Sequence, residues 1–67
     1  METYYVVKIK GKELYFSINY VFATLKEDYP MLFSSKEKAL KKLTDLENPF
    51  RARLFNIKKG DLEVVEY

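Results

Sequence analysis

Apolar and polar positions alternate on both sides of a glycine near the start of the chain. In VVKIKGKELYF, residues 6–16, two runs of strand-forming residues flank Gly11 and Lys12. This pattern predicts a β-hairpin with a two-residue loop that begins with glycine, as in a type II′ turn. The predicted cross-strand pairs are Lys10 with Glu13, Ile9 with Leu14, Val7 with Phe16, and Tyr5 with Ile18. In this register the large apolar side chains share one face, which a one-residue slip would scatter.

A helical period follows over residues 34–47. Small and apolar side chains recur at helical spacing, and they are Ala39, Leu40, Leu43 and Leu46. Such a stripe is typical of a surface helix docked on a sheet. Ser34 and Glu37 have the spacing of a capping box at its start. The helix is predicted to end at Asn48, because the residue before Pro49 disfavours the helical conformation.

The lysines of this helix raise the question of whether they bind a partner. Lys38, Lys41 and Lys42 lie opposite the leucine stripe at about 100° per residue. Lys41 is four residues from both Glu37 and Asp45, so pairs of opposite charge partly neutralise this face. We expect a solvated outer face rather than a phosphate-binding face or a docking surface for an acidic protein.

The end of the chain resembles a second hairpin. Residues 50–67, FRARLFNIKKGDLEVVEY, are predicted to form two strands around Lys59 and Gly60. The predicted pairs are Lys58 with Asp61, Ile57 with Leu62, Phe55 with Val64, and Arg53 with Glu66. Residues 20–25 fit a third strand or one turn of helix, and we favour the strand. Residues 31–33 fit a brief extended segment.

These elements predict a single α+β domain over residues 1–67. Its architecture would be ββ(β)αββ: a small antiparallel sheet of two hairpins with one amphipathic helix packed on one face. Whether the sheet has four strands or five depends on residues 20–29.

Composition narrows the possible chemistry. The chain has 67 residues and contains neither cysteine nor histidine, so disulfides and thiolate metal sites are excluded. The usual bases for a serine nucleophile are also missing. We therefore predict a protein that is not an enzyme and binds no metal or cofactor. Apolar runs are too short to span a bilayer, and we expect a cytoplasmic protein that does not bind membranes.

Aromatic and basic side chains provide the candidate binding residues. The leading interpretation is a non-catalytic protein-binding module, because Tyr and Arg are favoured at interfaces. Its predicted contact residues are Tyr4, Tyr15, Tyr67, Arg51 and Arg53. The alternative is a small nucleic-acid-binding protein that uses Lys8, Arg51, Arg53, Lys58 and Lys59. However, a net charge of +2 is weak for such a protein. A third possibility is a homodimer formed through the tyrosine-rich faces or through an open strand edge ending at Tyr67.

Residues 4–58 resemble small accessory proteins encoded by phages and prophages. The shared features are a glycine-turn hairpin, YYVVKIKGKELYFS, a short LF strand and a serine-capped SKEKA helix. This resemblance implies a stand-alone domain that binds and blocks a host or competing protein, as the compact anti-CRISPR inhibitors do. It identifies no functional residues.

Overall fold

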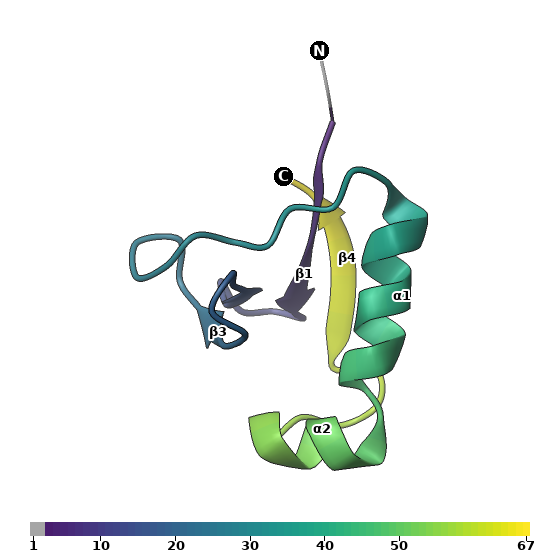
Figure 1. Ribbon diagram of the computed structural model, residues 1–67. Helices are drawn as coiled ribbons and strands as arrows, with labels where there is room; N and C mark the ends of the chain where they lie inside the picture. The colour runs from purple at the N-terminus through teal and green to yellow at the C-terminus, as the bar shows by residue number, and fades with distance from the viewer. Residues whose placement is uncertain (1–2) are drawn as a thin grey trace.

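The structure, a computed structural model, describes residues 3–67, which form four strands and two helices (Figure 1). The strands are β1 (Tyr5–Ile9), β2 (Tyr15–Phe16), β3 (Phe22–Ala23) and β4 (Leu62–Glu66). They form one antiparallel sheet in the order β3-β2-β1-β4. The helices are α1 (Lys36–Leu46) and α2 (Pro49–Phe55), and both pack against the sheet. The predicted α+β class is therefore confirmed, with one helix more and one hairpin fewer than expected.

The first hairpin has the predicted register. Lys8 pairs with Tyr15, and the backbone N–H of Ile9 donates to the carbonyl of Leu14 at 3.0 Å. The turn itself differs from the expectation. Lys12 N–H donates to the carbonyl of Ile9 at 3.1 Å, which makes Gly11, with φ +72°, the third residue of a four-residue turn. Positive φ at that position favours glycine, so Gly11 remains the residue that shapes the turn.

The predicted pairing of Tyr5 with Ile18 does not form, because a later segment lies where β1 and β2 diverge. Tyr5 and Phe33 exchange two backbone hydrogen bonds, each 2.9 Å long. Ile18 N–H donates instead to the carbonyl of Tyr29 at 3.0 Å. Residues 29–33 thus satisfy both backbones, and the brief extended segment expected before the helix is present.

Helix α1 begins at Lys36, two residues after the predicted start at residue 34. Its N-cap is Ser35 rather than Ser34, and the Ser35 side chain accepts from the N–H of Lys38. Leu46 is fully buried, whereas Leu40 is 44% exposed. Leu40 lies about 100° from Ala39 around the helix, and Lys42 lies about 60° away on the other side. The helix is therefore rotated so that Lys42, and not Leu40, borders the core.

The second hairpin was the main error of the sequence prediction, because residues 49–55 form helix α2. The side chain of Asn48 caps this helix by accepting from Phe50 N–H at 3.0 Å. Pro49 is its first residue. Proline is tolerated there because the N–H that it lacks would have no hydrogen-bond partner within the helix. Asn56 ends it in the left-handed conformation, with φ 56°.

Strand β4 consequently pairs with β1 rather than with residues 53–58. Val64 lies opposite Val7, and Leu62 lies opposite Ile9. The predicted turn around Lys59 and Gly60 does form, with Asp61 N–H donating to the carbonyl of Lys58 at 3.0 Å. It joins a helix to a strand instead of joining two strands. The sheet order leaves β4 at one edge, as expected for the last strand.

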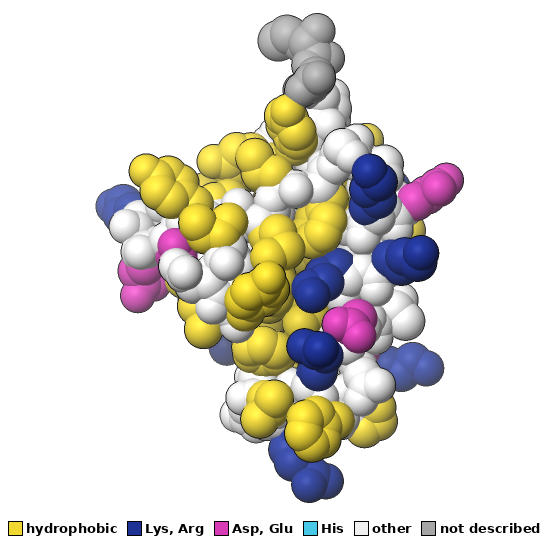
Figure 2. All heavy atoms as spheres, viewed as in Figure 1, with side chains coloured by type: hydrophobic (Ala, Val, Ile, Leu, Met, Phe, Trp, Pro, Cys, Tyr) yellow, Lys and Arg dark blue, Asp and Glu magenta, His cyan; other side chains and the backbone are white. Residues whose placement is uncertain are grey.

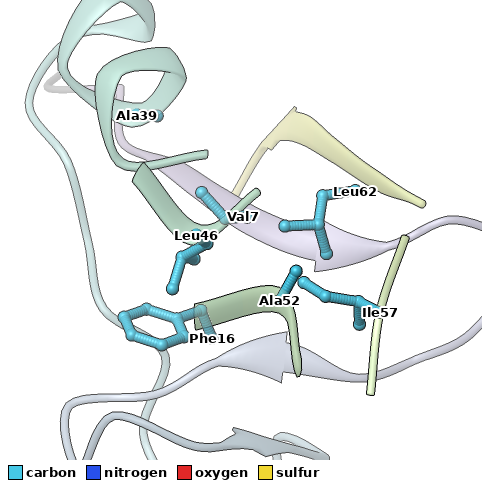
Figure 3. Packing of buried hydrophobic residues seen from close by; sticks show 7 residues of the cluster. All are labelled: Val7, Phe16, Ala39, Leu46, Ala52, Ile57 and Leu62. Carbon is cyan, nitrogen blue, oxygen red and sulfur yellow. The ribbon is translucent and has the colours of Figure 1, made fainter. Parts of the chain in front are cut away.

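The core lies between the sheet and both helices (Figure 3). Its buried residues come from all the major elements, and they are Val7, Phe16, Ala39, Leu46, Ala52, Ile57 and Leu62. In Figure 3 the Phe16 ring and Leu46 lie side by side. The sheet and the leucine side of α1 thus converge as predicted, but Ile18 is exposed and takes no part.

Candidate functional site

The sheet face away from the core carries the three tyrosines predicted to bind a protein. Val7 and Phe16 point into the core, so their neighbours Lys8 and Tyr15 lie on the opposite face. Lys8 Nζ is 5.9 Å from the centroid of the Tyr15 ring. Tyr67 N–H donates to the carbonyl of Tyr4 at 2.9 Å, which makes these two residues neighbours. The structure therefore places Tyr4, Tyr15 and Tyr67 on the same sheet face as Lys8.

The polar groups of this face bind one another. Lys8 Nζ is 3.7 Å from Glu63 Oε2, and the Tyr15 hydroxyl donates to Glu13 Oε2 at 2.9 Å. This hydrogen bond raises the pKa of Tyr15 above 10.0, and burial and the nearby carboxylates act in the same direction. The Tyr15 phenol thus stays neutral and hydrogen-bonded to Glu13, and the charge of Lys8 is balanced by Glu63.

The arginines predicted as contacts are separated by helix α2. A strand would have placed Arg51 and Arg53 on one face, but two helical positions differ by about 200°. Arg51 Nε lies 3.4 Å from Asp45 Oδ2, beside α1. Arg53 instead lines a hollow of about 620 Å³, together with Lys58 and Lys59. The five residues of the nucleic-acid alternative, including Lys8 on the sheet, therefore lie on three different surfaces.

An aromatic cluster joins the hairpin β2–β3 to helix α2. The ring centroids of Phe16 and Phe22 are 5.5 Å apart, and those of Phe22 and Phe55 are 5.4 Å apart. Phe16 and Phe55 are separated by 6.1 Å. All three pairs are edge-to-face, the arrangement that aromatic quadrupoles favour. This packing fixes the hairpin against the helices.

Lys42 covers the outer side of this cluster, contrary to the prediction of a fully solvated position. Its Nζ lies 5.4 Å from the centroid of Phe16 and 5.7 Å from that of Tyr20. The side chain is only 23% exposed, and Nζ is 3.9 Å from Asp45 Oδ2. The aliphatic stem can cover the rings while the ammonium stays near water. Lys42 therefore links α1 to the hairpin.

Tyr20 occupies an unusual position at the tip of that hairpin. Ser17 N–H donates to the carbonyl of Val21 at 2.8 Å, which encloses a loop of residues 18–20. Tyr20 has φ 61°, a left-handed conformation that bulky side chains rarely adopt. Three-residue hairpin loops commonly place glycine there. The ring is nevertheless 61% exposed, and its edge contacts Phe16.

Further exposed apolar side chains lie in this loop and beside it. Ile18, Val21 and Tyr29 are all exposed, and the hydrogen bond from Ile18 to Tyr29 holds two of them together. We call Ile18, Tyr20, Val21 and Tyr29 the tip surface. The tip surface is not predictable from the sequence alone, because residues 20–25 fit a regular strand and no glycine marks the turn. In Figure 2 hydrophobic side chains cover the middle of the face in view, beside lysines and arginines.

Residues 3–67 contain neither a candidate metal site nor a membrane-spanning helix. No group of three or more acidic, histidine or cysteine side chains is placed to hold a metal ion. Within the same residues, no helix has the length and apolar character needed to cross a membrane.

Comparison of the chain with protein-family models, with curated proteins and with solved structures finds no match.

Proposed function

We propose that this chain is a non-catalytic protein-binding module that contacts its partner through the tip surface. The observation that supports this most directly is Tyr20, a largely exposed aromatic ring held in a left-handed backbone conformation. Such strain persists only where surrounding structure enforces it, and it is concentrated at functional sites. Tyrosine is also among the residues that contribute most to binding at interfaces.

The tip surface is held in place before any partner binds. Asn19 Nδ2 donates to Asp28 Oδ2 at 2.8 Å, and Tyr29 N–H donates to Asp28 Oδ1 at the same distance. Ser17 is buried at the base of the loop, and its Oγ accepts from Asn19 N–H at 3.3 Å. A surface that is already ordered loses less conformational entropy on binding. These bonds therefore favour recognition by the tip.

The resemblance to phage and prophage accessory proteins leads to a narrower proposal. A small domain with a rigid aromatic tip can bind a host protein and block the surface that the host protein needs. In this proposal the chain is an inhibitor that acts by occupancy and performs no chemistry on its target.

A small nucleic-acid-binding protein is the second candidate function. One observation favours it: Arg53, Lys58 and Lys59 line the same hollow between the helices and the turn before β4. Glu47 shares this hollow, and its Oε2 accepts from Gly60 N–H at 2.6 Å. Phosphate contacts would make the affinity fall steeply as salt is added. An absence of oligonucleotide binding at low salt would exclude this candidate.

Affinity capture with matched variants tests the leading proposal. Tyr20 and Tyr67 are 61% and 62% exposed, but Tyr20 lies at the tip and Tyr67 lies beside the sheet face. We expect the wild type and Tyr67→Ala to capture one partner in stoichiometric amount and Tyr20→Ala to lose it. Circular dichroism would establish that both variants fold.

Two results would contradict the proposal. One is that the wild type captures no stoichiometric partner from a plausible host. The other is that Tyr20→Ala captures the partner as well as the wild type does. Loss with Tyr67→Ala alone would move the interface to the sheet face predicted from the sequence. Sedimentation of the purified wild type would show whether that face instead joins two copies of the chain.

A further inference from the structure

A shallow groove runs between helix α1 and the segment that precedes it. It encloses about 400 Å³ and is lined by Phe33, Lys38, Lys41, Lys42 and Asp45. Phe33 is partly buried against the core and supplies the apolar part of the lining. The remaining lining comes from α1 and is mostly cationic. We call this feature the lysine groove.

The lysine groove has more positive charge than its own carboxylate can balance. Asp45 is shared by two cations, since its Oδ2 is 3.9 Å from Lys42 Nζ and 3.4 Å from Arg51 Nε. Lys38 Nζ donates to the neutral hydroxyl of Ser34 at 3.1 Å. Lys41 is exposed and forms no ion pair among residues 3–67, so the pairs with Glu37 and Asp45 expected from the sequence do not form. The groove thus presents uncompensated ammonium groups.

The lysine groove and the tip surface are continuous. Lys42 lines the groove, and its ammonium also lies against the rings of Phe16 and Tyr20. A segment bound in the groove would therefore reach Tyr20 across Lys42. Such a segment would meet apolar contacts at both ends and cations between them.

We propose that the lysine groove binds an acidic peptide segment of the protein partner. Carboxylates of the segment pair with Lys38 and Lys41, and one of its apolar side chains packs on Phe33. Charge complementarity of this kind directs a partner to the correct surface and orientation. This inference rests on the proposed function and names the chemistry of the partner.

A single-stranded nucleic acid fits these observations less well. Its bases need open ring faces for stacking, but Phe16 is buried and packs edge-to-face with its neighbours. Of the rings beside Lys42 in residues 3–67, only that of Tyr20 is exposed. Asp45 lies among the cations, where it would repel a phosphate chain. A peptide can instead direct its own donors toward Asp45 and its carboxylates toward the lysines.

Selection from a library of short random peptides provides the first test. We expect the purified protein to enrich peptides that combine several Asp or Glu residues with one aromatic or aliphatic residue. Binding of a synthetic enriched peptide would then be measured by fluorescence anisotropy. Its affinity should fall as salt is added, because exposed charge pairs are screened.

Charge reversal at two locations tests the assignment to the groove. Lys38→Glu/Lys41→Glu and Lys58→Glu/Lys59→Glu each change the net charge by −4, from +2 to −2. All four side chains are exposed, so the two variants differ mainly in where the charge is reversed. We expect the groove variant to weaken peptide binding by about tenfold or more, or at least 1.4 kcal/mol. The control variant should change the affinity much less.

Several outcomes would overturn the inference. The first is a selection that does not enrich acidic peptides, and the second is an equal loss of peptide affinity in the two charge-reversal variants. The third is an oligothymidylate that binds more tightly than the peptide and loses its binding in Lys38→Glu/Lys41→Glu. The capture experiment separates this failure from failure of the proposed function. A partner lost with Tyr20→Ala but retained by Lys38→Glu/Lys41→Glu would contradict only the groove. If the wild type captures no partner, the proposed function fails.

Discussion

The ammonium of Lys42 lies 5.7 Å from the centroid of the Tyr20 ring, which joins helix α1 to the tip of the β2–β3 hairpin. The two residues are far apart in the sequence and belong to different elements. Phe16 lies beneath both of them, 5.4 Å from the ammonium and 6.1 Å from the Tyr20 ring. This contact places an aromatic side chain in a strained loop beside the most cationic part of the helix. The stability of the tip and its proposed recognition role therefore depend on the same few side chains.

Replacing Lys42 should measure what this contact contributes to stability. We expect Lys42→Ala to lower the free energy of unfolding by about 1 kcal/mol, through lost packing and a lost cation–π contact. Lys42→Met keeps most of the apolar stem and should recover part of that loss. Lys41→Ala, at an exposed position on the same helix, should stay within about 0.5 kcal/mol of the wild type. Urea unfolding followed by circular dichroism checks all three, and equal effects at the two lysines would contradict the role of Lys42.

The left-handed conformation of Tyr20 predicts an inverted preference between alanine and glycine. Any side chain with a Cβ is disfavoured at φ 61°, so Tyr20→Gly should be more stable than Tyr20→Ala by about 1 kcal/mol. Tyr29 is also exposed but has no positive φ. At that position the order should reverse, and Tyr29→Gly should have a free energy of unfolding about 0.5–1 kcal/mol lower than that of Tyr29→Ala. Thermal or urea unfolding of the four variants measures both differences. If the glycine and alanine variants rank in the same order of stability at both positions, Tyr20 is not strained.

The elements that the sequence predicted well depend on local information. Alternation around Gly11 defined the register of the first hairpin, and Lys8 indeed pairs with Tyr15. The helical period of residues 34–47 placed α1 to within two residues at its start and one at its end. In both cases the residues that determine the element lie within it, so no knowledge of the rest of the fold was required.

Helix α2 was missed because its short sequence fits two structures. In residues 50–54, FRARL, apolar and charged side chains alternate as they do in a strand. Asn48 and Pro49 fit the end of α1, but the same pair also fits the N-cap and first residue of a new helix. The choice is made by β4, which pairs with β1 and leaves no partner strand for residues 50–58.

The candidate site was less predictable than the fold because it depends on tertiary packing. Lys42 approaches the core only because α1 is rotated away from Leu40. Tyr20 adopts its left-handed conformation in a loop closed by Ser17 and Val21. No glycine or short motif records either feature. Strand alternation alone determines that Tyr15 and Tyr67 lie on the outer sheet face, so this part of the site follows from the sequence.

Removing the cap of α2 should destabilise the domain. Asn48→Ala deletes the acceptor for Phe50 N–H and should lower the free energy of unfolding by about 1 kcal/mol. Asn48→Asp retains an acceptor and adds a charge that helix N-termini favour, so it should match or exceed the wild type. Chemical denaturation monitored at a helical wavelength measures both. A neutral alanine variant would favour the strand predicted from the sequence.

The rotation of α1 predicts unequal effects of truncating two of its leucines. Leu46 is fully buried, so Leu46→Ala should lower the free energy of unfolding by about 2–4 kcal/mol. In a domain of this size, where the total is typically about 3–5 kcal/mol, most of the native state would be lost. Leu40 is 44% exposed, and Leu40→Ala should lower it by less than about 1 kcal/mol. Comparable losses of stability at the two positions would indicate that Leu40 and Leu46 both face the core, as expected from the sequence.

The hydrogen bonds that hold the tip predict a loss of stability in acid. The Asn19 and Ser17 side chains and the N–H of Tyr29 donate to Asp28, which lowers its pKa below 3.8. Above pH 3.8 the carboxylate is ionised in both states, and its contribution to stability is fully present. Below that value protons bind first to the unfolded chain, so the contribution is lost as the pH falls through the folded pKa.

The comparison that isolates this effect uses Asp28→Asn. Glu27, whose pKa is lowered below 4.5 by its bonds to Thr24, adds a decline of the same sign. Part of the acid-induced loss of stability seen in the wild type should therefore remain in Asp28→Asn. The double variant Asp28→Asn/Glu27→Gln should lose less stability in acid than Asp28→Asn does. Urea midpoints from neutral pH to about pH 3 measure the decline. The control is Glu66→Gln, at an exposed position on β4. The prediction fails if the urea midpoint of Asp28→Asn falls with decreasing pH as steeply as the midpoint of Glu66→Gln.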